Sequence, residues 1–131
     1  MPTLLQLAGV ECPRADGVSL VQLLRAQSQR VRETLHVEHA VCYSKEQAFH
    51  ALTDGHMKYI WRPESGTEQL FDLEKDGREE SELSKTLTAQ QTLETWRAQM
   101  IKQLAGRPEG FSDGNRLIPG RPYPPIQKAR K

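Results

Sequence analysis

The fold is decided by residues 53–76, which read TDGHMKYIWRPESGTEQLFDLEKD. Asp54-Gly55 favours a two-residue hairpin turn of type I′, because both central positions of that turn need a positive φ that Asp and Gly tolerate. A second reversal is predicted at 62–66, where Pro63 fixes φ and Gly66 is free to adopt the left-handed conformation. The stretch therefore predicts three short strands joined by two turns.

The residues before this stretch add another strand. Between 32 and 41 the side chains alternate between two faces, as in a strand. One face carries Leu35, Val37, His39 and Val41, and the other carries Thr34, His36, Glu38 and Ala40. Segment 47–52 is expected to pair with 57–62, and 69–73 to follow. Successive hairpins predict an antiparallel meander of about four strands, one face of which must be covered.

A long amphipathic helix is predicted to cover that face. Apolar residues recur at helical spacing between Ser84 and Ala105, and Gly106 ends the pattern. They are Ala89, Leu93, Trp96, Met100 and Leu104. Trp61, Trp96 and Phe71 are interpreted as the aromatic core that joins the helix to the sheet. A small antiparallel sheet packed by one long C-terminal helix belongs to the α+β class.

The two ends of the chain differ from this middle part. Two short helices are expected within 1–30, one after Pro2 and one after a Ser19 cap, and neither is long enough to be stable in water without tertiary contacts. After Gly106 the Gly, Pro and charge content predicts an extended or disordered tail. The predicted organisation is therefore a helical segment at 1–30, the sheet and helix at 31–106, and a tail at 107–131.

Composition disfavours several classes of function. The 131 residues include 18 basic and 17 acidic side chains, so no overall field favours nucleic acid. A nucleic-acid accessory role would have to use the basic C-terminus, which lacks interleaved aromatic residues. No apolar run approaches the ~18 residues of a membrane span, and residues 1–10 lack the basic region of a signal peptide. These features do not indicate a cellular compartment.

The chain has two cysteines, Cys12 and Cys42. Two are too few for a disulfide framework, and they are interpreted as unpaired or buried small side chains.

Three blocks of the sequence resemble the C-terminal part of sulfatases, the alkaline-phosphatase-like enzymes that hydrolyse sulfate esters. The first is MPTLLQLAGV at 1–10 followed by DGVSL at 16–20, the second is ETLHVEHA at 33–40 with CYS at 42–44, and the third is KYIW at 58–61 with EQLFDLEKD at 68–76. They occur in the order of the family and span roughly residues 1–105. The resemblance implies a fragment of a sulfatase whose complete form hydrolyses a sulfate ester.

The catalytic machinery of that family lies upstream of the matching region. Its signature, C/S-x-P-x-R, supplies the formylglycine, and a divalent cation held by Asp and Asn oxygens polarises the sulfate. Cys12-Pro13-Arg14 has its Pro and Arg too early for the signature and is interpreted as a loop. No catalytic residue and no cofactor is therefore expected in this chain, which should be inactive alone. Calcium and formylglycine are implied only for a complete sulfatase, and the missing catalytic domain is the implied partner.

Two histidines are the candidate substrate-binding residues. The resemblance implies this role, because sulfatases approach the bound ester with residues of their C-terminal region, and His36 and His39 lie in a matching block. Their spacing places them on opposite faces of a strand, so they are not expected to bind one metal ion together. His50, His56 and Cys42 could converge with one of these two histidines, but the spacing matches no zinc pattern, and no metal site is predicted. The alternative for His39 is a partly buried polar residue held by a hydrogen bond.

Two functions of different classes follow from these observations. The first is the non-catalytic C-terminal fragment of a sulfatase. The second is a free-standing binding or interaction module, which keeps the fold and binds a partner through the surface that a catalytic domain would cover. An in-frame C/S-x-P-x-R upstream of Met1 would distinguish the first from the second.

Overall fold

The computed structural model describes residues 1–11, 17–40 and 44–122. The elements follow one another as α1 (Pro2–Leu7), α2 (Val21–Leu24), β1 (Leu35–His39), the 3₁₀ turn η1 (Lys45–Gln47), β2 (Phe49–Thr53), β3 (Met57–Trp61), β4 (Glu68–Asp72), the 3₁₀ turn η2 (Leu87–Ala89) and α3 (Gln90–Leu104). The chain separates into two compact units, with the boundary between Thr34 and Leu35. Cys12, Cys42 and the Cys12-Pro13-Arg14 segment lie outside the described residues.

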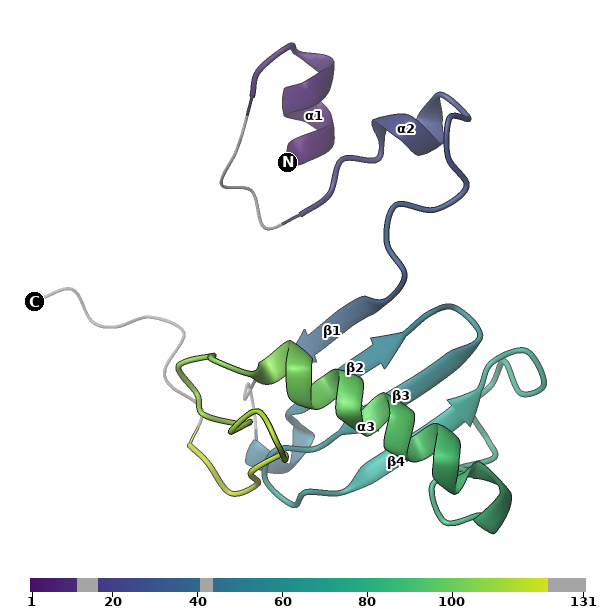
Figure 1. Ribbon diagram of the computed structural model, residues 1–131, viewed down its shortest axis with the longest axis vertical. Helices are drawn as coiled ribbons and strands as arrows, with labels where there is room; N and C mark the ends of the chain where they lie inside the picture. The colour runs from purple at the N-terminus through teal and green to yellow at the C-terminus, as the bar shows by residue number, and fades with distance from the viewer. Residues whose placement is uncertain (12–16, 41–43, 123–131) are drawn as a thin grey trace, which may run out of the picture. The chain divides into compact units, whose positions relative to one another are not determined.

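The second unit contains a four-stranded antiparallel sheet in the order β1-β2-β3-β4, with α3 lying across one face (Figure 1). Each strand pairs with the next one along the chain, which confirms the predicted meander and the α+β class. The alternation in β1 also has the predicted phase, because His36 is opposite Leu52 and Glu38 is opposite His50. These residues lie on the α3 side of the sheet, whereas Leu35, Val37 and His39 lie on the other side.

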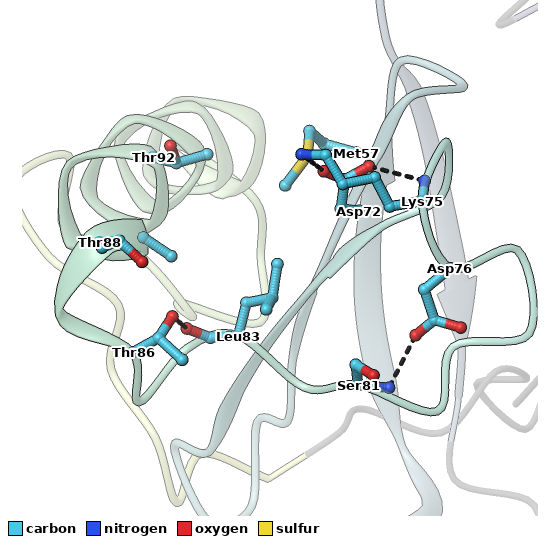
Figure 2. A pocket seen from close by; sticks show the side chains of 10 residues that line it. Met57, Asp72, Lys75, Asp76, Ser81, Leu83, Thr86, Thr88 and Thr92 are labelled. Carbon is cyan, nitrogen blue, oxygen red and sulfur yellow. Dashed lines mark hydrogen bonds and ion pairs between the residues drawn. The ribbon is translucent and has the colours of Figure 1, made fainter.

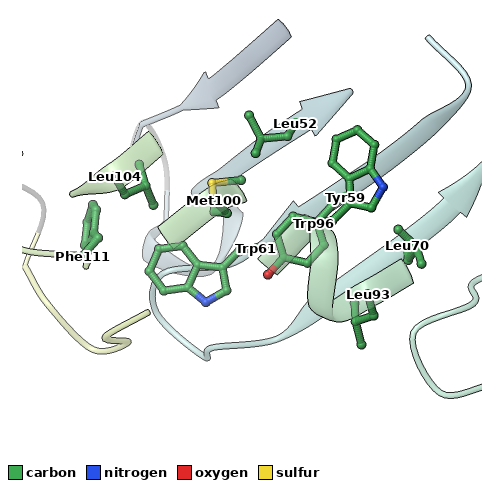
Figure 3. Packing of buried hydrophobic residues seen from close by; sticks show 9 residues of the cluster. All are labelled: Leu52, Tyr59, Trp61, Leu70, Leu93, Trp96, Met100, Leu104 and Phe111. Atoms are coloured by element: carbon green, nitrogen blue, oxygen red, sulfur yellow. The ribbon is translucent and has the colours of Figure 1, made fainter. Parts of the chain in front are cut away.

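The main core lies between the sheet and α3 (Figure 3). It contains Leu52, Tyr59, Trp61, Leu70, Leu93, Trp96, Met100, Leu104 and Phe111. The four α3 side chains in this set follow the helical spacing that the sequence predicts. Trp61 and Trp96 belong to this core, as predicted. Phe71 does not, because it lies on the opposite face of β4 and packs with Ala51 and Ile60 in a second, smaller cluster.

The β2–β3 turn differs from the predicted type I′ turn. Thr53 pairs with Lys58, so four residues and not two lie between the closing pair. Gly55 has the expected positive φ of 93°, but the described non-glycine residues with positive φ are Ala26 and Glu79, and Asp54 is not among them. The reason is a hydrogen-bonded Asp side chain: the Asp54 Oδ1 accepts from the backbone N–H groups of His56 and Met57 at 2.9 and 2.8 Å, which supports a wider turn.

Helix α3 begins at Gln90, six residues after the predicted start. Polar contacts hold the preceding residues in turns, because Glu82 Oε1 accepts from the backbone N–H groups of Leu70 and Ser84. The hydroxyl of Thr86 in turn donates to the Leu83 carbonyl at 2.6 Å. Through the Leu70 N–H, these contacts attach segment 82–86 to the middle of β4, ahead of the start of α3.

Residues 107–122 are packed on the second unit, although the sequence predicts an extended or disordered tail there. Phe111 is fully buried in the main core, and Ser112 donates a hydrogen bond to the Ile101 carbonyl at 2.8 Å. Isolated bridges join Ser112 to Ala105 and to Leu117. The low apolar content of this segment gives no sign in the sequence that Phe111 is buried in the core. Residues 123–131 of the predicted tail lie outside the described residues.

The first unit contains the two predicted short helices. None of the α1 residues is buried, and Val21 is the buried residue of α2. The hydroxyl of Thr3 accepts a hydrogen bond from the Leu20 N–H at 3.0 Å, which links the two helical segments. Within the described residues, no helix is both long and apolar enough to cross a membrane.

Candidate functional site

A cluster of polar side chains lies on the α3 side of the sheet, where β1 pairs with β2. His36 and Glu38 come from β1, and His50 comes from β2. The register places Glu38 directly opposite His50 and His36 diagonally across from it, so all three side chains project toward α3. We call these three residues the His–Glu cluster. The structure brings His36 and His50 together, although their spacing in the sequence matches no zinc pattern.

The side chains of the His–Glu cluster contact one another. His36 Nε2 lies 3.1 Å from His50 Nδ1, and the two rings stack with their centroids 5.3 Å apart. Glu38 Oε2 lies 4.0 Å from His50 Nδ1. His50 is completely buried, and its ring also packs against Trp61 and Phe111 of the main core. One nitrogen or oxygen atom from each of the three residues lies within 4.8 Å of the other two.

An arginine from the segment after α3 holds the carboxylate of the cluster. Arg107 Nη1 and Nη2 donate to the two Glu38 oxygens at 2.9 and 3.2 Å, and its Nη2 and Nε donate to Glu109 at 2.8 and 3.2 Å. The hydrogen bonds to Glu109, and after them those to Glu38, raise the pKa of the Arg107 guanidinium. Arg107 gives no signal of this role in the sequence, because it lies in the segment 107–131 that is predicted to be a tail.

Burial determines the protonation of both histidines. It lowers the pKa of His36 and lowers that of His50 to about 4, against the opposing effect of the Glu38 charge. Both imidazoles are therefore neutral at pH 7, and each has one nitrogen that donates and one that accepts. The other His36 nitrogen, Nδ1, lies 3.4 Å from Gln103 Nε2 of α3. A neutral pair of this kind suits hydrogen bonding or metal ligation better than the binding of an anion by charge.

His39, the other sequence-predicted site residue, lies on the opposite face of β1. Its ring stacks on Phe49 with the centroids 5.6 Å apart, and it is partly exposed. The two predicted histidines are therefore on different faces of the sheet, as their spacing required. His56 belongs to neither face, because it lies in the β2–β3 turn and pairs with Glu74 at 2.6 Å.

A cavity of about 500 Å³ lies between the end of the sheet and the start of α3 (Figure 2). Its charged groups are already paired: Lys75 Nζ contacts Asp72 at 2.7 Å, and Asp76 accepts from the Ser81 N–H at 2.7 Å. Two carboxylates and one ammonium leave a net negative charge, which opposes the binding of a sulfate group. This cavity is therefore a poor candidate for recognising a sulfate ester.

No family model matches this chain. It is 34% identical to an arylsulfatase of Clostridium perfringens over 131 residues, which is 99% of this chain and 27% of that protein. The chain thus spans about a quarter of the length of the curated relative that it matches.

Solved structures of sulfatases contain a region with a similar fold. A 2-O GAG sulfatase superposes with a TM-score of 0.70 at 26% identity, covering 79% of this chain and 23% of that one. A sulfatase structure from Bacteroides thetaiotaomicron gives the same score, identity and coverage. A third, solved in complex with D-glucosamine-2-N,6-O-disulfate, has a TM-score of 0.69 at 17% identity and supports the fold alone. Sequence and fold therefore assign this chain to the sulfatases, as the counterpart of their C-terminal region.

Proposed function

We propose that this chain is the C-terminal subdomain of a sulfate ester hydrolase and that it completes the enzyme without carrying the bond-breaking step. The observation that carries the proposal is the match of 99% of the chain to about a quarter of an arylsulfatase. The remaining three quarters of that relative leave room for a catalytic domain. The structural likeness to a 2-O GAG sulfatase at 26% identity favours a sulfated carbohydrate as the substrate of the complete enzyme.

The sequence supports a non-catalytic role for these 131 residues. No Cys or Ser in them begins a C/S-x-P-x-R signature, so this stretch offers no site for formylglycine. In the proposed arrangement the nucleophile and a calcium ion are supplied by the catalytic domain. The subdomain forms part of the wall of the substrate-binding site and contacts the substrate there.

The apolar surface of the first unit supports a partner of this kind. Leu4, Leu7 and Leu24 expose 65%, 57% and 71% of their surface, respectively. Helices of six and four residues are too short to be stable without tertiary contacts, and the large apolar side chains exposed on them are available to a partner. We propose that the catalytic domain of the enzyme covers α1 and α2.

We propose His39 as the histidine that contacts the substrate. It lies on the sheet face that α3 does not cover, and the edge of that face at Leu35 and Val37 is exposed. His36, the second candidate, is held between His50 and Gln103 and would have to give up one of these contacts to reach a substrate directly.

A chimera tests the proposal. Residues 1–131 replace the matching segment of the Clostridium perfringens arylsulfatase, and hydrolysis of an aryl sulfate is measured. We expect turnover by the chimera, and none by this chain alone or by the arylsulfatase lacking the segment. A soluble, folded chimera without turnover would contradict the proposal and favour the free-standing module. Turnover by the chain alone, lost on a single substitution within it, would show that the catalytic centre is in these residues.

A further inference from the structure

We infer that His36, Glu38 and His50 form a binding site for a divalent transition-metal ion, with Zn²⁺ as the ion that this donor set fits best. The spacing of histidines and cysteines in the sequence matches no zinc pattern and so predicts no metal site. The donors instead become neighbours through the β1–β2 register. The inference concerns the His–Glu cluster only and does not depend on the proposed sulfatase function.

The geometry of the donor atoms carries the inference. Zinc binds His nitrogens at ~2.0–2.1 Å in a tetrahedral arrangement, which places two nitrogen donors on one ion ~3.3 Å apart. His36 Nε2 and His50 Nδ1 are 3.1 Å apart. Glu38 Oε2, at 4.0 Å from His50 Nδ1, needs only a small rotation to complete the set. Two imidazoles and one carboxylate favour zinc or its transition-metal neighbours over calcium or magnesium, which prefer oxygen donors.

The surroundings of the cluster suit a cation. Glu38 and Glu109 carry two negative charges against the one positive charge of Arg107, so this group of charges sums to −1 before an ion enters. Arg107 also donates to both oxygens of the Glu38 carboxylate, including the proposed donor Oε2, in the way that hydrogen-bonded groups orient metal-binding carboxylates. The burial of His50 keeps its ring in one place, and the partial exposure of Glu38 leaves a fourth position for water.

The hydrogen-bonded state and the metal-bound state differ in the position of one proton, because each neutral imidazole carries one proton in both states. In the absence of metal, one N–H lies between His36 Nε2 and His50 Nδ1, whereas the ion would need the lone pairs of both nitrogens. With that proton on His36, metal binding would move it to Nδ1, 3.4 Å from the Gln103 side chain, and no proton would be released. The amide of Gln103 can rotate to present its oxygen, so the same residue can serve both tautomers. Bound metal would thus join the edge strand β1 to β2.

Metal titration tests the inference on the full chain. Cys12→Ser and Cys42→Ser are introduced first, so that thiolates cannot bind the ion. Zn²⁺ binding is measured by calorimetry, and Co²⁺ is used as a coloured substitute whose visible absorption is strong only at tetrahedral sites. We expect one ion per chain. Since losing even a group that orients a metal ligand costs 10–100-fold in affinity, we expect His36→Gln to raise the Kd more than about 100-fold.

Two further variants make the result specific. His39→Gln changes a histidine of the same strand on the opposite face and should leave the Kd unchanged. Glu38→Gln keeps the size of the third donor but removes its charge, and it should weaken binding as well. Circular dichroism of the metal-free variants shows whether each one is folded. The inference is overturned if neither ion binds at up to millimolar concentration, if folded His36→Gln and Glu38→Gln bind like the parent, or if His39→Gln loses as much affinity as His36→Gln.

Discussion

Arg97 of α3 and Glu68 of β4 form a two-pronged ion pair, in which Nε and Nη2 donate to the two carboxylate oxygens at 2.7 Å each. The same carboxylate accepts the hydroxyl of Tyr59, a residue without solvent exposure in the main core. One side chain on β4 thus satisfies the polar end of a core aromatic and fixes the helix against the sheet.

Glu68→Ala should destabilise the protein by about 1–3 kcal/mol, because it leaves the buried Tyr59 hydroxyl without its acceptor. Urea denaturation followed by tryptophan fluorescence measures the change. Arg116→Ala is the control, since it breaks a more exposed ion pair, with Asp113, and should cost less than about 0.5 kcal/mol. Equal losses in the two variants would show that the shared carboxylate has no special role.

Trp96→Ala should cost about 3–5 kcal/mol, the usual range for removing a large aromatic side chain from a core. Trp96 is 5% exposed and belongs to the same cluster as Tyr59 and Met100. Leu87→Ala is the control, because Leu87 is 92% exposed and such substitutions change the unfolding free energy by no more than about 0.5 kcal/mol. The interpretation of Trp96 as a core residue fails if the two variants unfold at the same denaturant concentration.

Gly55→Val should lower the free energy of unfolding by about 1 kcal/mol or more, because a β-branched residue is poorly tolerated at positive φ. A Cβ at this position would meet no atom within 4 Å, so the loss would come from the backbone conformation and not from a clash. Gly55→Asn should cost less, since Asn tolerates positive φ better. Thermal unfolding of both variants checks the order, and a smaller loss for Val than for Asn would contradict it.

Asp54 should make stability depend on pH below about pH 4. Partial burial by itself would raise its pKa, but the hydrogen bonds from Met57 and His56 prevail, and the net effect is a lowered pKa in the folded state. A lowered folded pKa gives a stabilisation that is present above the unfolded value of ~3.9 and is lost as the pH falls through the folded value. Asp54→Asn keeps a hydrogen-bond acceptor without the titration.

Denaturation midpoints of the parent and Asp54→Asn between pH 6 and pH 2 measure this effect. The advantage of the parent over the variant should shrink as the pH falls below about 4. A constant difference over the whole range would show that the Asp54 charge contributes nothing to the turn.

The parts of the fold that follow from local periodicity were predictable. Alternation fixed the two faces of β1, and the helical spacing of Leu93, Trp96, Met100 and Leu104 identified the face of α3 that packs on the sheet. The two-residue turn was not correct, because the Asp54 side chain, and not a positive φ at Asp54, satisfies the turn. Sequence propensity treats Asp-Gly as a backbone signal and does not register what the carboxylate accepts.

The candidate site was harder to predict from the sequence than the fold. His36 and His50 are fourteen residues apart, and their contact depends on the length of the β1–β2 connection, which sets the register. Arg107 reaches Glu38 from sixty-nine residues away, because Phe111 anchors the segment after α3 in the core. A single buried aromatic in a Gly- and Pro-rich stretch gives no periodic signal, so the segment looks like a tail until its packing is seen.

The strand order of the sheet has a consequence for synthesis on the ribosome. Each strand pairs with the one made just before it, so the sheet forms from contacts that are close in sequence and quick to make. Helix α3, which covers the sheet, is synthesised later. At ~5–20 residues per second, Leu104 is added about 2 to 6 s after Asp72. During that interval the nascent chain presents Tyr59, Trp61 and Leu70 uncovered, and this is the period in which a chaperone would be of most use to it.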